Sequence, residues 1–196
     1  QHAVQGAGVG VRAVARTRVD TKRNHGRQLA PSRVQLAGSG TVLVVCPSSL
    51  VFNWISECAR FFPGVEAVGL YGEAPAAREE LIRKGARLLV TSYALLRRDR
   101  EALESREFRA VILDEAQHIK NPESQTAQAA FSLRAPERWI LTGTPVENHL
   151  GELWSLFNFL APGLLGTSAE FRQKFSEPMA HGDDEALRKL RGKAGR

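Results

Sequence analysis

The sequence predicts an α/β fold in which a parallel sheet is covered by helices on both faces. Two observations predict it. Short, continuously apolar runs rich in β-branched residues recur along the chain, and stretches with helical periodicity separate them. Several of these runs are followed directly by a cluster of polar residues. Strands that alternate with helices at this spacing form βαβ units, and ligands of such sheets bind at the carboxyl ends of the strands.

The first predicted strand is Thr41–Cys46, whose aliphatic run is typical of a strand buried on both faces. Pro47 ends it, and the serines that follow are expected to cap a helix that Phe62-Pro-Gly stops. A second strand is expected near 66–70, then a helix over about 75–84 that ends at Gly85. A third strand is predicted over Arg87–Val90.

The second half of the chain repeats this alternation. A charged helix is expected over 98–106, a fourth strand over Arg109–Leu113, a helix over about 123–133 and a fifth strand over Arg138–Leu141. An amphipathic helix begins at about 150, and two more helical stretches are predicted near 168–175 and 183–192. Residues 1–40 show no period of 2 or 3.6 and receive no predicted element.

Charge is distributed unevenly. The 196-residue chain carries a net charge of +6, and all of this excess lies in residues 1–40, because residues 41–196 are net neutral. A basic arm that binds phosphates is one interpretation of this segment. A tail outside any fold is the interpretation we favour.

Composition excludes several classes of protein. No apolar run reaches the length of a bilayer span, so no membrane partner is expected. Two cysteines, Cys46 and Cys58, are too few for a disulfide framework and are predicted to be buried free thiols. The five histidines show no ligand-like spacing, which argues against a zinc site. The tryptophans lie on predicted apolar faces and are interpreted as core residues: Trp54, Trp139 and Trp154.

Asp114-Glu115-Ala116-Gln117 follows the fourth predicted strand. A carboxylate there can hold the magnesium ion that bridges nucleotide phosphates, and its neighbour can orient the attacking water. The alternative is a pair of acids that only stabilises the start of the next helix through its dipole.

The wider sequence context favours the catalytic interpretation. VILDEAQHIKNPES and WILTGTPVENHLGELWSLFNFLAPGLLG, preceded by LVVCPSSLVFNW and VTSYALL, resemble the Swi/Snf group of superfamily-two helicase-like proteins, in that family's order, from about residue 41 to 196. Within the group the chain is most similar to bacterial members with a DEAQ box. The resemblance implies a RecA-like P-loop NTPase lobe, incomplete, over residues 41–166. It also implies a helical extension over 167–196 toward a second lobe.

The resemblance implies a role for each polar cluster. Asp114 would bind magnesium and, with Glu115, support hydrolysis, while Gln117 would couple the nucleotide to the rest of the motor. Thr142, Gly143 and Thr144 would link hydrolysis to movement on DNA. Two clusters would face DNA: Pro47, Ser48 and Ser49, then Thr91, Ser92 and Tyr93. Hydroxyls and free backbone N–H groups suit contacts to phosphate oxygens, which position a strand without reading its sequence. Helix capping is the alternative for each serine or threonine.

The implied activity is DNA-dependent ATP hydrolysis. The implied cofactors are ATP and magnesium, and the implied partners are double-stranded DNA and a second RecA-like lobe. We therefore expect a translocase that remodels protein–DNA complexes in the cytoplasm of a bacterium, associated with the nucleoid.

The chain departs from the family's pattern in two places. No Gly-Lys-Thr or Gly-Lys-Ser occurs, although the family cradles phosphates with such a loop. The sequence also stops before the family's arginine-rich motif, so this chain alone is expected to be a poor ATPase. A shifted reading frame upstream of Thr41 would explain the missing loop, the patternless start and the initial Gln1.

The rival interpretation is a lobe without ATPase activity that binds DNA or protein. A dinucleotide-binding oxidoreductase is set aside because no G-x-G-x-x-G lies between a strand and a helix.

Overall fold

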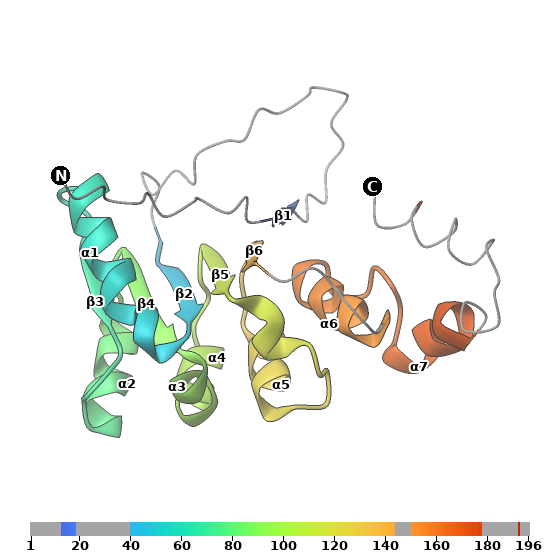
Figure 1. Cartoon of the computed structure of the whole chain (residues 1–196). Coiled ribbons are helices and arrows are strands. Elements are labelled where there is room, and N and C mark those ends of the chain that lie inside the picture. Colours follow the sequence, from blue (N-terminus) through green and yellow to red (C-terminus); the bar gives the residue numbers. More distant parts are fainter. Residues whose placement is uncertain (1–12, 19–39, 144–149, 178–191, 193–196) are drawn as a thin grey trace, which may run out of the picture.

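The computed structural model describes residues 13–18, 40–143, 150–177 and 192. In this part of the chain the strands form one sheet in the order β1-β6-β5-β2-β4-β3 (Figure 1). Their bounds are Ala13–Arg18 (β1), Val42–Cys46 (β2), Ala67–Gly69 (β3), Leu88–Ser92 (β4), Ala110–Asp114 (β5) and Glu137–Thr142 (β6). β2 to β6 are parallel, which confirms the predicted sheet.

β1 is a strand for which the sequence analysis predicted no element. It pairs antiparallel with β6, with Ala13 opposite Thr142 and Arg18 opposite Glu137. Its sequence AVARTR is too short and too rich in arginine to show a strand pattern. The available edge of β6 decides its conformation, an example of tertiary context overriding local propensity.

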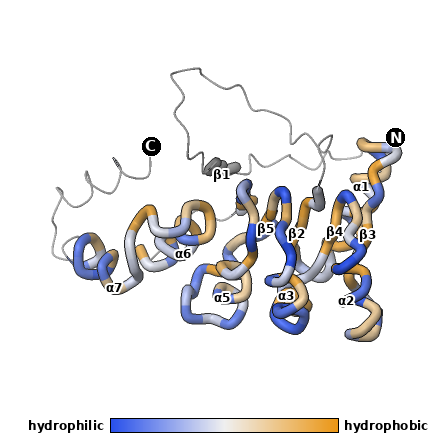
Figure 2. Tube along the Cα trace, turned by 180° about the vertical axis from the view of Figure 1, so that it is seen from behind, coloured by the Kyte–Doolittle hydropathy of each residue, from blue (hydrophilic) through white to orange (hydrophobic). Residues whose placement is uncertain are grey.

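Helices cover both faces of the sheet, as predicted. α1 (Val51–Phe61) covers one face, where it packs on alternate strand residues such as Val44, Val90 and Ile112. The intervening residues, among them Leu43, Leu89 and Val111, face the opposite core. That core is closed by α2 (Pro75–Lys84), α3 (Tyr93–Arg98), α4 (Arg100–Glu104), α5 (Gln125–Ser132) and α6 (Leu150–Leu160). The outer turns of α3 and α5 are hydrophilic, whereas hydrophobic residues dominate α6 (Figure 2).

The chain continues past α6 into α7 (Ser168–Phe171) and one π-helical turn, Arg172–Ser176. Phe171 and Phe175 pack there with Trp154 of α6 in a small separate cluster. Thr167 and Glu170 form a capping box at the start of α7, which confirms a helix near 168–175. The predicted helix 183–192 lies outside the described residues except for residue 192.

One predicted helix is wrong in detail. The stretch 98–106 was expected to be a single helix, but α3 ends at Arg98 and α4 starts at Arg100, with Asp99 between them. Asp99 is held out of either helix by a bidentate ion pair with Arg78 of α2, at 2.7 Å for both nitrogen–oxygen distances. Both side chains are only 7% exposed, so this pair ties α2 to the α3–α4 corner.

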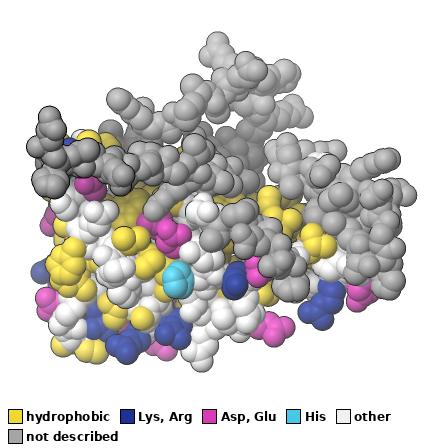
Figure 3. All heavy atoms as spheres, in the orientation of Figure 1, with side chains coloured by type: hydrophobic (Ala, Val, Ile, Leu, Met, Phe, Trp, Pro, Cys, Tyr) yellow, Lys and Arg dark blue, Asp and Glu magenta, His cyan; other side chains and the backbone are white. Residues whose placement is uncertain are grey.

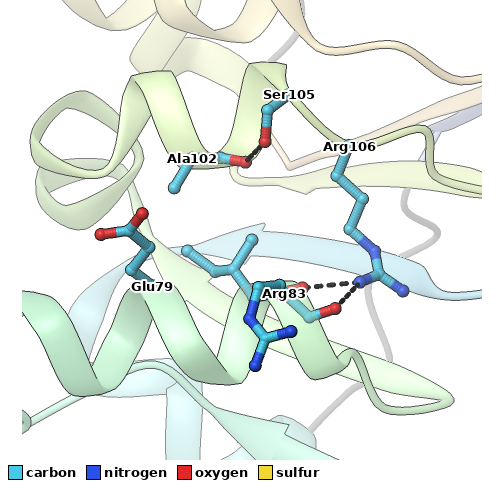
Figure 4. Close-up of a pocket in the computed structure, with 6 residues that line it drawn as sticks. Glu79, Arg83, Ala102, Ser105 and Arg106 are labelled. Atoms are coloured by element: carbon cyan, nitrogen blue, oxygen red, sulfur yellow. Dashed lines mark hydrogen bonds between the residues drawn. The ribbon is translucent and has the colours of Figure 1, made fainter.

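Arg106 closes the edge of the sheet where the strands begin. Its guanidinium donates to the carbonyl oxygens of Ile82 and Arg83 at the end of α2 (Figure 4). It also donates to Thr41 Oγ1 just before β2. A surface pocket of about 260 Å³ lies beside it, between α2 and α4. Because it lies at the amino ends of the strands, this pocket is distant from the polar clusters of interest.

Arg138 of β6 is also buried, and its guanidinium donates to the carbonyl oxygens of Leu133 and Phe159. Burial lowers the pKa of Arg138.

Basic and acidic side chains alternate over the face shown in Figure 3, in keeping with the net neutrality of residues 41–196. Within the described ranges, we find no helix with the length and apolar character needed to cross a bilayer.

Candidate functional site

The polar clusters of β2, β4, β5 and β6 meet at one edge of the sheet. Cys46 lies opposite Ser92, Val45 lies opposite Leu113, and Asp114 lies opposite Leu141. The four strands therefore end at nearly the same level, and the residues that follow them are neighbours in space. This confirms the prediction that the clusters share the carboxyl edge, except for Thr144, which lies outside the described residues.

Asp114, the last residue of β5, is a buried carboxylate with 2% exposure. Its Oδ2 accepts a hydrogen bond from the indole Nε1 of Trp54 at 3.0 Å, and its Oδ1 accepts one from the backbone N–H of Glu115 at 3.0 Å. The Tyr93 hydroxyl donates to the Asp114 carbonyl oxygen at 2.8 Å. Hydrogen bonds thus hold both the side chain and the backbone of Asp114, as expected of a buried polar residue.

Glu115 adopts a left-handed backbone conformation, with φ 53° and ψ 56°. It is the one non-glycine residue with positive φ among those the structure describes. That conformation costs an L-residue about 1–2 kcal/mol, and such strain concentrates at functional sites. It turns the half-buried side chain away from the direction that β5 would give it and toward Gln117.

Gln117 connects the ends of two strands. It lies in the 3₁₀ helix η2 (Ala116–Ile119), where its Nε2 donates to Glu115 Oε2 at 3.1 Å. The Thr142 hydroxyl at the end of β6 donates to Gln117 Oε1 at 3.3 Å. The Gln117 amide therefore joins the acidic pair to the Thr142-Gly143 segment. A movement of Glu115 or of Thr142 would change the hydrogen bonds of Gln117 and so affect the other residue.

The prediction that Ser48 and Ser49 cap α1 is wrong. A 3₁₀ turn, η1 (Ser48–Leu50), lies between the strand and the helix, and Leu50 occupies the cap position without a side-chain hydrogen bond. The turn forms because the Leu50 N–H bonds to the Pro47 carbonyl oxygen at 2.9 Å. Both serine side chains are consequently exposed beside Pro47 at the carboxyl edge.

The second cluster is arranged differently, because Thr91, Ser92 and Tyr93 are all buried. Ser92 caps α3, since its hydroxyl accepts from the Leu95 N–H at 3.3 Å. Tyr93 stacks on His118 with ring centroids 4.5 Å apart. Thr91 Oγ1 has no hydrogen-bond partner among the described residues. In this structure the side chains of the cluster are therefore buried, and that of Tyr93 contacts the acidic box through the Asp114 carbonyl oxygen.

Ionisable neighbours of the acidic box are held neutral. Burial, aided by the negative charge of Asp114, raises the pKa of the Cys46 thiol to about 12. The same two causes raise the pKa of Tyr93, and burial raises that of Cys58. Both cysteines are free and buried, as predicted. Neither thiol is a thiolate at neutral pH, so neither acts as a nucleophile.

Sequence reasoning missed Trp54 as a member of this site. It was assigned to the core, and its ring does pack against the α1-side cluster, yet its N–H reaches Asp114. The available signal was chemical rather than positional: a tryptophan in an apolar helix face needs an acceptor for its indole N–H. Nothing in the spacing identifies that acceptor 60 residues further along the chain.

The residues at this edge fit a magnesium nucleotide. Mg²⁺ is usually held by one or two carboxylates together with water and substrate phosphates, and not by a complete cage of protein ligands. Asp114 and Glu115 could supply such a partial set, and the described residues contain no group of three or more His, Cys, Asp or Glu side chains that could form a complete one. Of the two, the Asp114 carboxylate is fixed at the end of a strand, where it could hold an ion.

Fold and site together define a RecA-like α/β lobe of the ATPase type. The structure of the Sulfolobus solfataricus SWI2/SNF2 ATPase core in complex with dsDNA superimposes with a TM-score of 0.72 at 36% identity, covering 80% of this chain and 32% of that one. The family model for the SNF2-related domain matches residues 11–194, and the chain therefore belongs to this family. The match begins inside the segment for which the sequence predicted no element.

Similarity to individual relatives is high over this region. The chain is 41% identical over 140 residues to the TATA-binding protein-associated factor MOT1 of Saccharomyces cerevisiae, covering 70% of this chain and 7% of that protein. It is 36% identical over 156 residues to the human DNA excision repair protein ERCC-6, covering 77% and 10%. The chain thus spans a tenth or less of the length of these curated relatives.

Proposed function

We propose that this lobe binds ATP with magnesium at the carboxyl edge of its sheet and forms one half of a motor that hydrolyses ATP when it engages duplex DNA. The observation that carries the proposal is the fixed acidic pair, Asp114 and Glu115, joined through Gln117 to Thr142. A structure made only to stabilise the next helix would not need a strained Glu115 linked through Gln117 to a second strand.

In this proposal each residue has one task. Asp114 would hold the magnesium ion, which would supply positive charge to offset the charge that develops on the phosphates. Glu115 orients and deprotonates the attacking water, and its carboxylate is held in place by Gln117. Gln117 carries the state of the nucleotide to Thr142 and Gly143, and from there to Thr144. A second lobe of the parent protein would complete the site.

Duplex DNA is proposed to lie against Pro47, Ser48 and Ser49. The exposed hydroxyls of the serines suit contact with phosphate oxygens and carry no information on base sequence. For Thr91, Ser92 and Tyr93 the DNA-facing role stays a prediction, and it requires their main chain to make the contact because their side chains are buried.

The names of the relatives suggest the wider role. One is named for its association with the TATA-binding protein, and the other for DNA excision repair. We propose that the parent of this lobe remodels protein–DNA complexes by moving along duplex DNA. We also propose that the protein is bacterial and associated with the nucleoid, because residues 114–117 read DEAQ, as in the bacterial members of the group that the chain resembles.

The rival function is a lobe that binds DNA or protein without hydrolysing ATP, and the absence of Gly-Lys-Thr from the sequence favours it. Binding of a fluorescent ATP analogue, with magnesium and with a chelator, separates the two. We expect magnesium to tighten binding to the wild-type chain and to have no such effect on Asp114→Asn. Equal affinity with and without magnesium in the wild-type chain would support the rival.

A further inference from the structure

Trp54 makes a contact that the proposed function does not use. It lies in α1, which covers one face of the sheet, and its indole Nε1 lies 3.0 Å from Asp114 Oδ2 at the end of β5. The bond joins residues 60 positions apart. An indole nitrogen is a donor only, so the direction of this bond is fixed: Trp54 donates and the Asp114 carboxylate oxygen accepts.

The contact determines the orientation of the carboxylate. Oδ1 accepts from the Glu115 N–H and Oδ2 accepts from Trp54, both at 3.0 Å. Two donors on different elements, the Trp54 indole of α1 and the Glu115 backbone N–H, thus restrain rotation of the Asp114 carboxylate plane and give it a fixed orientation at the carboxyl edge.

Trp54 is itself held by packing. It lies against the cluster that α1 forms with β2, β4 and β5, together with Leu50 and Ile55. The indole is half-buried, so its N–H is partly shielded from competing water. Because α1 follows directly after η1, a displacement of Ser48 and Ser49 would move the helix that carries this donor.

We propose that Trp54 is a positioning residue for Asp114: its indole N–H orients the carboxylate toward magnesium and links α1, with the exposed serines before it, to the acidic box. The inference rests on the proposed function, in which Asp114 holds the metal. Partners that hydrogen-bond to metal ligands change metal affinity by about 10- to 100-fold when they are removed.

The test measures metal binding directly. Mn²⁺ replaces Mg²⁺ as a paramagnetic probe, and free Mn²⁺ is followed by electron paramagnetic resonance in titrations of the full chain. Trp54→Phe keeps an aromatic ring but removes the donor, and we expect it to weaken Mn²⁺ binding by about tenfold or more. The matched control is Trp154→Phe, which removes an indole N–H that donates to the Gly166 carbonyl oxygen at 3.1 Å, away from the acidic box. Its Mn²⁺ affinity should equal that of the wild-type chain.

Asp114→Asn separates failure of the inference from failure of the proposed function. If Asp114→Asn abolishes Mn²⁺ binding while Trp54→Phe leaves it unchanged, the proposed function stands and the role of Trp54 is refuted. If Asp114→Asn also leaves Mn²⁺ binding unchanged, Asp114 is not the ligand and both are refuted.

A second measurement does not depend on the stability of the tryptophan variants. In ¹H–¹⁵N spectra, Asp114→Asn should shift the indole N–H resonance of Trp54 and leave that of Trp154 in place. A Trp54 resonance that does not move would show that the hydrogen bond is absent in solution, which overturns the proposal.

Discussion

At the scale of single residues, the acidic box combines strain with hydrogen bonding. Glu115 holds a left-handed backbone while its side chain accepts from Gln117, and Asp114 beside it accepts from Trp54. Glycine adopts this backbone conformation without a steric penalty, so stability alone would favour glycine at position 115. A glutamate there indicates that the carboxylate is needed.

This argument predicts an order of stability among variants at position 115. Glu115→Gly and Glu115→Ala both lose the carboxylate and its bond to Gln117, but only glycine relieves the left-handed backbone. We expect the glycine variant to exceed the alanine variant in free energy of unfolding by about 1 kcal/mol, after glycine's entropy in the unfolded chain is included. Denaturant unfolding followed by circular dichroism measures both. An alanine variant as stable as the glycine variant would show that the backbone is relaxed.

At this scale, the residues that form the site could be predicted only where polar residues directly follow a predicted strand. Asp114, Glu115, Gln117 and Thr142 lie at the predicted edge for that reason. Trp54 was not predictable as a partner of Asp114, because its contact depends on how α1 lies across the sheet. The burial of Thr91, Ser92 and Tyr93 was likewise hidden, since the strand signal does not extend as far as β4 itself does.

At the scale of elements, η1 is the feature that gives the Pro47–Ser49 segment its exposure. Because a 3₁₀ turn separates β2 from α1, the serines neither continue the strand nor cap the helix. They are left as exposed hydroxyls at the carboxyl edge.

The double variant Ser48→Glu and Ser49→Glu tests this surface. Two added carboxylates should repel phosphates, and affinity for duplex DNA should fall to a similar degree for every base sequence tested. The matched control places the same charges at Ser56 and Ser105, which are also exposed. Fluorescence anisotropy of labelled duplexes measures both. An equal loss in the control, or a loss confined to some sequences, would contradict a backbone contact at Pro47–Ser49.

Helices and strands could be predicted where the local sequence has a strong apolar pattern. The predictions failed where contacts with distant residues determine the local structure. β2 to β6 and α1, α2, α5 and α6 lie close to their predicted bounds because each has a clear apolar pattern. The α3–α4 break at Asp99 follows from a long-range ion pair with Arg78, and β1 follows from pairing with β6. Neither interaction has a signature in the local sequence.

At the scale of the whole molecule, parallel topology gathers the candidate site. Four strands end at one level, so residues far apart in the chain, from Pro47 to Gly143, meet along a single edge. The opposite edge is closed by Arg106 and the end of α2. A lobe built in this way presents these polar residues along one edge, where we propose that a nucleotide and a second lobe bind.

The central claim is that this edge hydrolyses ATP in response to DNA, and one measurement tests it most directly. Phosphate release by the proposed two-lobe protein is compared with and without duplex DNA, for the wild type and Glu115→Gln. We predict that the variant loses DNA-stimulated hydrolysis by about 100-fold or more, the range for a lost general base, while binding of magnesium and ATP is unchanged. Hydrolysis by Glu115→Gln at the wild-type rate would contradict the account.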